Sequence, residues 1–297
     1  MNISLSCLSD KGKERTCNED AFIACLNLNE QNWDVKATDG FVPCNETGTL
    51  IVVVDGIGGA GSGDVAADIA IRKVRETFTR SSVEDAIKKQ AYQELMKKAV
   101  EVADQAICQH VEMDFDTMGM GCTILMAWLN DHRVHITWAG DSRGYIFSPR
   151  QGLKRLTKDH SLVQQMVDRG EITQEEAFIH PDNNIITRSI GDCDVDKQPE
   201  YVEIEINDGD VILLCSDGLC GYCSDKDIEK GMRMKYGNTM EMSAKLLEMA
   251  LNAGGGDNIC IAIIAVACDE NLSQIHLSIW QKIVDFFKIK RPLVEKM

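Results

Sequence analysis

The chain has 297 residues, 44% of them hydrophobic, and a formal net charge of −16 at pH 7. That apolar content is enough for one large core or at most two small domains. The excess of acid argues against a nucleic-acid partner, because a phosphate backbone needs a basic face, and no internal stretch is long and apolar enough to span a bilayer.

The N-terminal residues and the cysteines indicate the compartment. Residues 1–7 lack the basic region and the sustained apolar core of a secretory signal. The twelve cysteines are scattered through predicted strands and helices, which in a chain without a signal is typical of reduced, buried thiols. We expect reduced thiols also for the pair Cys220 and Cys223, since no second Cys-x-x-Cys exists to complete a zinc site; a redox-sensitive pair is the alternative. We expect a cytoplasmic monomer.

The apolar patterning predicts both strands and helices. Strands are expected at 21–26, 50–54, 123–129, 134–138, 145–147, 201–206, 211–215 and 259–266. Helices are expected at 62–78, 83–111, 161–169, 225–234 and 241–251. Ser62 is the expected N-cap of the first helix.

The connections between these elements predict the class of fold. Segment 27–48 is polar and without periodicity, so we expect a surface excursion with a short hairpin. Short turns predict antiparallel hairpins within 123–147 and within 201–215. Helices arrive in separate groups between the strands, which favours an α+β layered domain.

Four acidic clusters stand at the ends of apolar runs or beside glycine turns. They are Asn18-Glu19-Asp20, Asp55-Gly56, Asp217-Gly218 and Asp257-Asn258. A carboxylate at the mouth of a buried strand is costly unless its charge is compensated. A divalent cation compensates it, and hard oxygen ligands suit Mg²⁺ or Mn²⁺. No single cluster is specific, because Asp-Gly is also a common turn.

The order of the motifs along the chain is far more specific than any one of them. They are 15–20 (RTCNED), 54–59 (VDGIGG), 118–123 (MGMGCT), 139–143 (AGDSR), 156–161 (LTKDHS), 180–181 (HP), 187–191 (TRSIG), 215–219 (CSDGL) and 256–258 (GDN). Over residues 4–266 the chain resembles the bacterial branch of the PP2C (PPM) family of metal-dependent serine/threonine protein phosphatases. The resemblance implies a β-sandwich of two mainly antiparallel sheets flanked by helices, with a binuclear metal cleft at one end. It also implies a phosphatase domain at 1–268, with a flap at 157–191.

The resemblance assigns roles to the acidic residues. Asp55 would bridge two Mn²⁺ or Mg²⁺ ions, helped by the carbonyl of Gly56. Asp217 and Asp257 would complete the shell of the first ion, and Glu19 and Asp20 would hold metal-bound waters. Asp257 alone is also compatible with a turn residue, and Asp20 with a cap.

Two further residues and one departure follow from the same motifs. Arg15 would bind the substrate phosphate in a bidentate manner; the alternative is a surface salt bridge with Asp10 or Glu14. Asp141, together with Asp217, would bind a third ion; the alternative is an Asx-turn that closes a hairpin from Trp138 to Tyr145.

Ile57 stands where eukaryotic relatives place a histidine proposed as the general acid, and isoleucine cannot donate a proton. A metal-bound water is the expected donor, with His160 and His180 as alternatives. Asn184 falls where some relatives have a third-metal ligand.

The expected function is metal-dependent hydrolysis of phosphoserine and phosphothreonine in proteins, opposing a serine/threonine kinase of the same cell. One alternative is a catalytically silent, phosphatase-like module that binds phosphoproteins. Another is a phosphatase that acts on an anti-anti-sigma factor.

The tail, 269–297, has a strong helical period, with apolar Ile275, Ile279, Ile283 and Phe286 on one face. We expect an amphipathic helix that packs on the phosphatase domain, and truncation after Cys268 should then lower the melting temperature. A docking helix for a partner and a membrane-surface helix are the alternatives.

Overall fold

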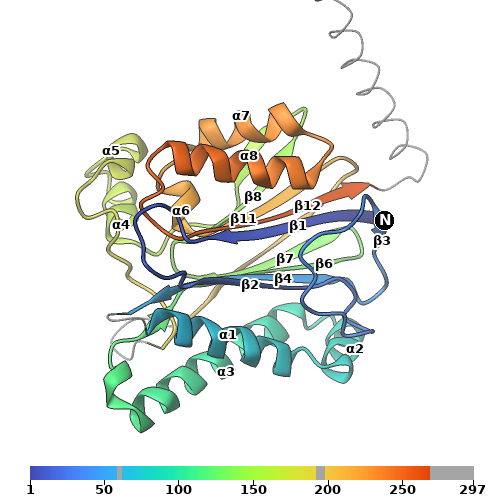
Figure 1. Ribbon diagram of the computed structural model, residues 1–297. Coiled ribbons are helices and arrows are strands. Elements are labelled where there is room, and N and C mark those ends of the chain that lie inside the picture. The colour runs from blue at the N-terminus through green and yellow to red at the C-terminus, as the bar shows by residue number, and fades with distance from the viewer. Residues whose placement is uncertain (59–61, 192–197, 268–297) are drawn as a thin grey trace, which may run out of the picture.

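The protein consists of two stacked β-sheets between two layers of helices (Figure 1). The computed structural model describes residues 1–58, 62–191 and 198–267. The first sheet has the strand order β3-β1-β12-β11-β8-β9 and the second β10-β7-β6-β4-β2, with the short β5 paired to β4. Neighbouring strands are antiparallel throughout. The predicted α+β sandwich is therefore confirmed.

The elements have the following bounds. The first sheet contains β1 (Asn2–Asp10), β3 (Val42–Pro43), β8 (Arg143–Ser148), β9 (Gly152–Arg155), β11 (Val211–Cys215) and β12 (Ile259–Ala267). The second contains β2 (Asp20–Cys25), β4 (Thr49–Ile57), β5 (Gly121–Cys122), β6 (Ile124–Asn130), β7 (Arg133–Ala139) and β10 (Glu200–Glu205). The helices are α1 (Gly63–Thr77), α2 (Arg80–Lys89), α3 (Tyr92–Met113), α4 (Leu162–Asp168), α5 (Gln174–Phe178), α6 (Asp217–Cys220), α7 (Asp225–Lys235) and α8 (Thr239–Asn252), with a 3₁₀ turn η1 (Phe115–Thr117).

Three apolar layers hold the sandwich together, and β4 shows how one strand serves two of them. Ile51 and Val53 point into the layer between the sheets. Leu50, Val52 and Val54 point the other way, into the layer beneath α1 and α3. The third layer lies between the first sheet and the helices α7 and α8. Because both faces of the central strands are covered, these strands read as continuous apolar runs, and each fully buried Val, Leu or Ile contributes about 1.5–3 kcal/mol.

The prediction of one helix over 83–111 was wrong. The chain forms α2 and α3 instead, separated at Gln90, which has a left-handed φ of 55° and ends α2 through a backbone N–H bond to the carbonyl of Ala86. No glycine or proline marks this break. Tertiary packing accounts for it, because Tyr92 at the start of α3 packs edge-on against Trp128 of β6 with 4.9 Å between ring centroids. At α1, Ser62 holds the N-cap position as expected but makes no side-chain capping bond to the helix.

Two of the predicted hairpins were also wrong. β10 pairs with β7 in the second sheet, whereas β11 pairs with β8 and β12 in the first, so 201–215 crosses between sheets. The turn at 140–142 does the same, since β7 and β8 belong to different sheets. Only the β6–β7 hairpin within 123–147 is confirmed. The reason is that short polar turns specify a change of direction but not the identity of the next pairing partner.

Segment 27–48 is packed more closely than expected. Leu28 and Trp33 are buried in the layer under the second sheet, and the hydroxyl of Thr38 accepts a 2.9 Å hydrogen bond from the backbone N–H of Leu5. Its strand β3 pairs with β1 rather than within a local hairpin. Polar composition concealed these few anchoring residues.

No helix in the described ranges is long and apolar enough to cross a membrane. The predicted tail helix at 269–297 lies outside the described residues.

Candidate metal centre

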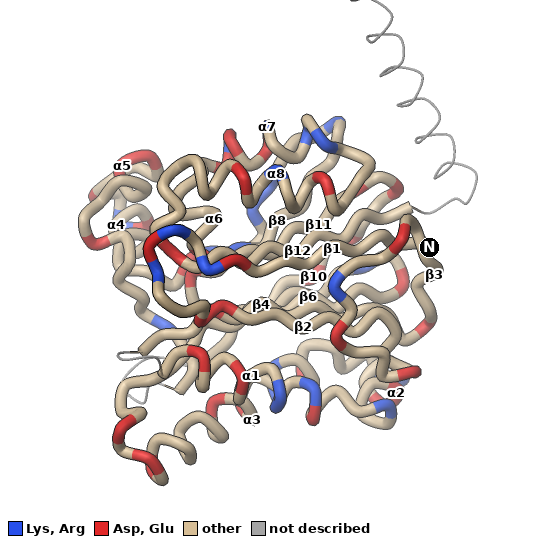
Figure 2. Tube along the Cα trace, viewed as in Figure 1, with Lys and Arg blue, Asp and Glu red and all other residues tan. Residues whose placement is uncertain are grey.

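The acidic clusters meet at one end of the sandwich because the ends of β2, β4, β11 and β12 meet there. β4 ends and β2 begins at this end, in a register that places Asp20 directly opposite Asp55. β11 ends beside the start of β12, with Cys215 opposite Ile261. Asp217 follows β11 and Asp257 precedes β12, so both lie at this end of the first sheet. Figure 2 shows acidic positions gathered at this end of both sheets.

Asp55 occupies the central position among these carboxylates. Asp20 lies directly opposite it across the β2–β4 pair, and the charges of both Asp20 and Asp217 act on it. Burial raises the pKa of Asp55 well above its ordinary value, and repulsion from Asp20 and Asp217 raises it further. Burial likewise raises the pKa of Asp20 to about 8, and that of Asp217 to about 6. Carboxylates placed this closely need a compensating positive charge to ionise together.

Asp141 faces the same site from the turn between β7 and β8. It is 7% exposed, and burial together with the charge of Asp217 raises its pKa well above the ordinary value. A cavity of about 290 Å³ is bordered by Asp141, Asp217, Asp257 and, from segment 157–191, Asn184. The wall that this segment forms is therefore part of the same cleft.

Position 56 requires glycine because neighbouring backbone atoms leave no room for a side chain. A Cβ atom on this residue would lie 2.3 Å from the carbonyl oxygen of Gly63 and 2.9 Å from that of Glu19. Its N–H donates a 3.2 Å hydrogen bond to that same carbonyl of Glu19. The glycine thus brings the first acidic cluster against the end of β4.

Arg15 approaches the site from the loop between β1 and β2. Its Nη2 lies 2.9 Å from Oδ2 of Asp257, and its side chain is 49% exposed. The predicted alternatives, ion pairs with Asp10 or Glu14, do not occur among the described residues. A half-exposed guanidinium beside the acidic cluster is accessible to an incoming phosphate.

The chemistry of these donors fits divalent cations. Oδ1 of Asp20 and Oδ1 of Asp141 are buried and have no hydrogen-bond partner within the described residues, and a buried acceptor without a partner is costly. No three His, Cys, Asp or Glu side chains of the described chain surround a common point. The coordination shell of a cation at this site therefore needs backbone carbonyls and water in addition to the carboxylates, which is how hard cations are commonly bound.

Sequence reasoning missed the residues that position the acidic loops. Asn258 is 4% exposed; its Oδ1 accepts a 2.8 Å hydrogen bond from the N–H of Glu19, and its Nδ2 donates at 2.9 Å to the carbonyls of Lys11 and Cys17. Ser216 donates a 2.6 Å hydrogen bond to Asp20. The signal for Asn258 was present in the motif 256–258, but its partners lie more than 200 residues away.

The two histidines considered as proton donors are engaged elsewhere. Nδ1 of His160 accepts a 3.0 Å hydrogen bond from the N–H of Gly140, and burial lowers the pKa of His160. Its Nε2 faces Glu200 at 3.2 Å. His180 accepts from the N–H of Asp182 through Nδ1. Both histidines therefore use Nδ1 to accept from a backbone N–H group.

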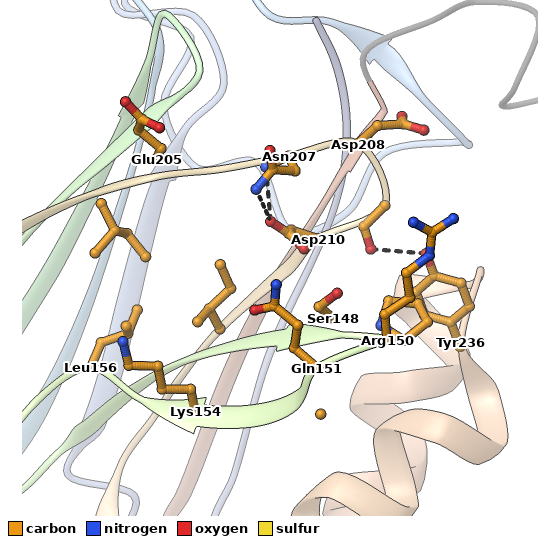
Figure 3. A pocket seen from close by; sticks show the side chains of 15 residues that line it. Ser148, Arg150, Gln151, Lys154, Leu156, Glu205, Asn207, Asp208, Asp210 and Tyr236 are labelled. Carbon is orange, nitrogen blue, oxygen red and sulfur yellow. Dashed lines mark hydrogen bonds between the residues drawn. The ribbon is translucent and has the colours of Figure 1, made fainter.

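A larger cavity, about 770 Å³, lies at the opposite end of the sandwich, between the β8–β9 turn and the β10–β11 turn (Figure 3). Asp210 accepts from the N–H of Asn207 there, and Tyr236 donates to the carbonyl of Gly209. None of the acidic set borders it. Its mixed lining includes Arg150, Lys154 and Glu205.

The fold and the acidic cleft together indicate an enzyme that depends on divalent cations. Comparison with known proteins agrees: the model of the protein phosphatase 2C family matches residues 8–259. The chain is 30% identical over 215 residues to the serine/threonine phosphatase stp of Listeria monocytogenes, covering 72% of this chain and 83% of that protein. It is 34% identical over 217 residues to the serine/threonine protein phosphatase PstP of Mycobacterium tuberculosis, covering 73% of this chain but only 40% of PstP.

A solved structure of a relative contains metal ions. The catalytic domain of PstP in complex with two manganese ions superposes with a TM-score of 0.69 at 28% identity, covering 89% of this chain and 99% of that domain. The chain belongs to the protein phosphatase 2C family. It is a metal-dependent serine/threonine protein phosphatase.

Proposed function

We propose that the carboxylates at the end of the sandwich form a binuclear Mn²⁺ or Mg²⁺ centre that hydrolyses phosphoserine and phosphothreonine in proteins. The observation that carries this assignment is the position of Asp55, directly opposite the buried Asp20 across the β2–β4 pair and close enough to Asp217 for their charges to interact. When bound, the ions would lower the pKa of a water and stabilise the charge on the phosphoryl oxygens.

Each residue has a task that its position supports. Asp55 and the carbonyl of Gly56 would hold both ions, and Asp217 and Asp257 would complete one shell. Glu19 and Asp20 would orient water, because Ser216 and Asn258 fix the segment that carries them. Arg15 would turn from Asp257 to the substrate phosphate, since a guanidinium offers two parallel donors.

The substrates are phosphorylated proteins of the kind made by a serine/threonine kinase of the same cell. Segment 157–191, which borders the cleft, would act as a flap against the substrate protein. Supporting this, residues 156–160 are bonded to the turn that carries Asp141: the N–H of His160 donates to the carbonyl of Gly140 at 3.0 Å, and Arg143 pairs with Asp159 at 2.7 Å.

A direct experiment is hydrolysis of p-nitrophenyl phosphate by the purified full chain. We expect turnover with Mn²⁺, complete loss with excess EDTA, and recovery when Mn²⁺ is restored, because the bound ions would supply the activation of water in the cleft. A phosphothreonine peptide should behave in the same way. Undiminished hydrolysis in EDTA would contradict the metal assignment.

Asp141→Ala tests the third ion. We expect this variant to retain two tightly bound ions and to lose much of its turnover, because Asp141 would share only the weakest ion with Asp217. Calorimetric titration with Mn²⁺ should show three sites in the wild type and two in the variant. Two sites in both proteins would reject the third ion, and unchanged turnover would reject its role.

A further inference from the structure

Large apolar side chains are exposed to solvent at the end of α3 and along the loop that follows it. Met113 is 80% exposed, Phe115 72% and Met118 71%. They are three of the seven exposed large hydrophobic residues in the described ranges. Single exposed apolar residues are ordinary, whereas three within six positions indicate a contact surface. We call residues 112–118 the α3–β5 surface.

This surface is close to the metal centre along the chain. Gly121, three residues after Met118, pairs with Ile57, the neighbour of Gly56. Because a chain spans at most about 3.6 Å per residue, Met118 lies within about 11 Å of Gly121. A peptide extended from the cleft advances about 3.3 Å per residue, so positions three to six away from a phosphoresidue can reach the surface. Figure 1 shows the loop after α3 at the same end of the molecule as α6.

The α3–β5 surface is also acidic. Glu112, Asp114 and Asp116 are exposed among the apolar side chains, and the sequence has no Lys or Arg between Lys98 and Arg133. Figure 2 shows only acidic and uncharged positions along this loop. No ion pair formed within the described parts of the chain uses these three carboxylates. A partner that fits must therefore combine apolar with basic side chains.

We propose that the α3–β5 surface binds the segment of the substrate phosphoprotein that flanks the phosphoresidue, and that it selects basic and apolar side chains there. The inference rests on the proposed function, since it needs the phosphoresidue to occupy the acidic cleft. Met113 and Phe115 would contact the apolar side chains of the substrate, while Glu112 and Asp116 would attract the basic ones.

The backbone of the surface is held by its own hydrogen bonds, so its outward side chains can be changed. Asp114 accepts from the N–H of Asp116 at 3.2 Å, and its carbonyl accepts from the hydroxyl of Thr117 at 2.6 Å. The N–H of Met120 donates to the carbonyl of Thr117 at 3.0 Å. Test variants should therefore keep Asp114 and Thr117.

The experiment compares three substrates with the Mn²⁺-loaded full chain: p-nitrophenyl phosphate, a phosphothreonine peptide flanked by Arg and Leu, and one flanked by Asp and Ser. The variants are Met113→Ser/Phe115→Ser and Glu112→Lys/Asp116→Lys. Met234→Ser/Met240→Ser is the matched control, since these exposed methionines (54% and 48%) belong to α7 and α8.

We expect the serine variant to lower kcat/KM about tenfold for the Arg/Leu peptide, mainly through KM, a typical effect of truncating central contact residues. The lysine variant should lose the preference for the Arg/Leu peptide over the Asp/Ser peptide. Both variants should hydrolyse p-nitrophenyl phosphate as the wild type does. The control variant should match the wild type with all three substrates.

An unchanged kcat/KM for the Arg/Leu peptide in the serine variant would overturn the proposal, as would an equal fall with p-nitrophenyl phosphate. Sedimentation that shows a wild-type dimer and a monomeric serine variant would assign the surface to self-association and would also overturn it. The catalytic assignment is judged separately, by EDTA-sensitive hydrolysis of p-nitrophenyl phosphate in the wild type.

Discussion

Asp55→Asn is expected to reduce hydrolysis of p-nitrophenyl phosphate by on the order of a thousandfold or more, equivalent to about 4 kcal/mol of transition-state stabilisation. The amide keeps the shape of the side chain but supplies no negative charge between Asp20 and Asp217. Saturating Mn²⁺ stabilises a protein that binds it only when folded, by about 4 kcal/mol at a thousandfold excess over Kd. The rise in melting temperature that Mn²⁺ causes should therefore shrink or vanish in the variant.

The same substitution should not unfold the metal-free protein. Because burial and neighbouring carboxylates raise the pKa of Asp55, its ionised form destabilises the folded state, and the neutral amide relieves that repulsion. Asp210→Asn is the matched control: Asp210 is buried, at 5% exposure, but it lies at the opposite end and accepts from the N–H of Asn207. That variant should retain full turnover. Near-wild-type activity in Asp55→Asn would refute the bridging role.

Asn258→Ala is expected to destabilise the fold by about 3 kcal/mol, because one buried and two partly buried hydrogen bonds of about 1 kcal/mol each are lost. It should also lower kcat/KM at least tenfold. The side chain ties the loop that carries Arg15 and Glu19 to the start of β12, so KM should rise as the phosphate contact loosens. Urea unfolding and steady-state kinetics measure the two effects.

Asn130→Ala is the control that shows what the loss of a buried side-chain amide does away from the catalytic loop. Asn130 is 3% exposed and donates one 2.9 Å hydrogen bond to the carbonyl of Glu46, at the other end of β6. We expect a loss of about 1 kcal/mol with unchanged kinetics. Equal kinetic effects in both variants would show that Asn258 does not position the catalytic loop.

The chemistry of the site could be predicted from the sequence because it depends on residue type and on local position. Asp55 and Asp217 follow apolar runs, and such runs form buried strands whatever their partners. The acidic clusters at strand ends therefore indicated a cation site, and the order of the motifs indicated the family. The helices α1, α4, α7 and α8 were predicted for a similar reason, since their periodicity and caps are local.

The pairing of strands was decided by the tertiary structure alone. β1 was not predicted from the sequence. Ile3, Leu5 and Cys7 occupy alternate positions, but the residues between them are serines. Ser4 and Ser6 are nevertheless buried, where they form hydrogen bonds of 2.9 Å and 2.7 Å with Thr239 and Ser243 of α8. A polar residue that finds a buried partner in a distant helix has no local signature.

The proposed metal ligands could be predicted from local sequence, whereas the residues that position them could not. The turns at 140–142 and 207–210 move the chain from one sheet to the other, and nothing in a four-residue turn specifies which sheet the next strand joins. That crossing brings Asp141 to the cleft, and the contacts of Asn258 bring Glu19 there. Residue type determined what the site can bind, whereas packing over more than 200 residues of chain determined which side chains meet.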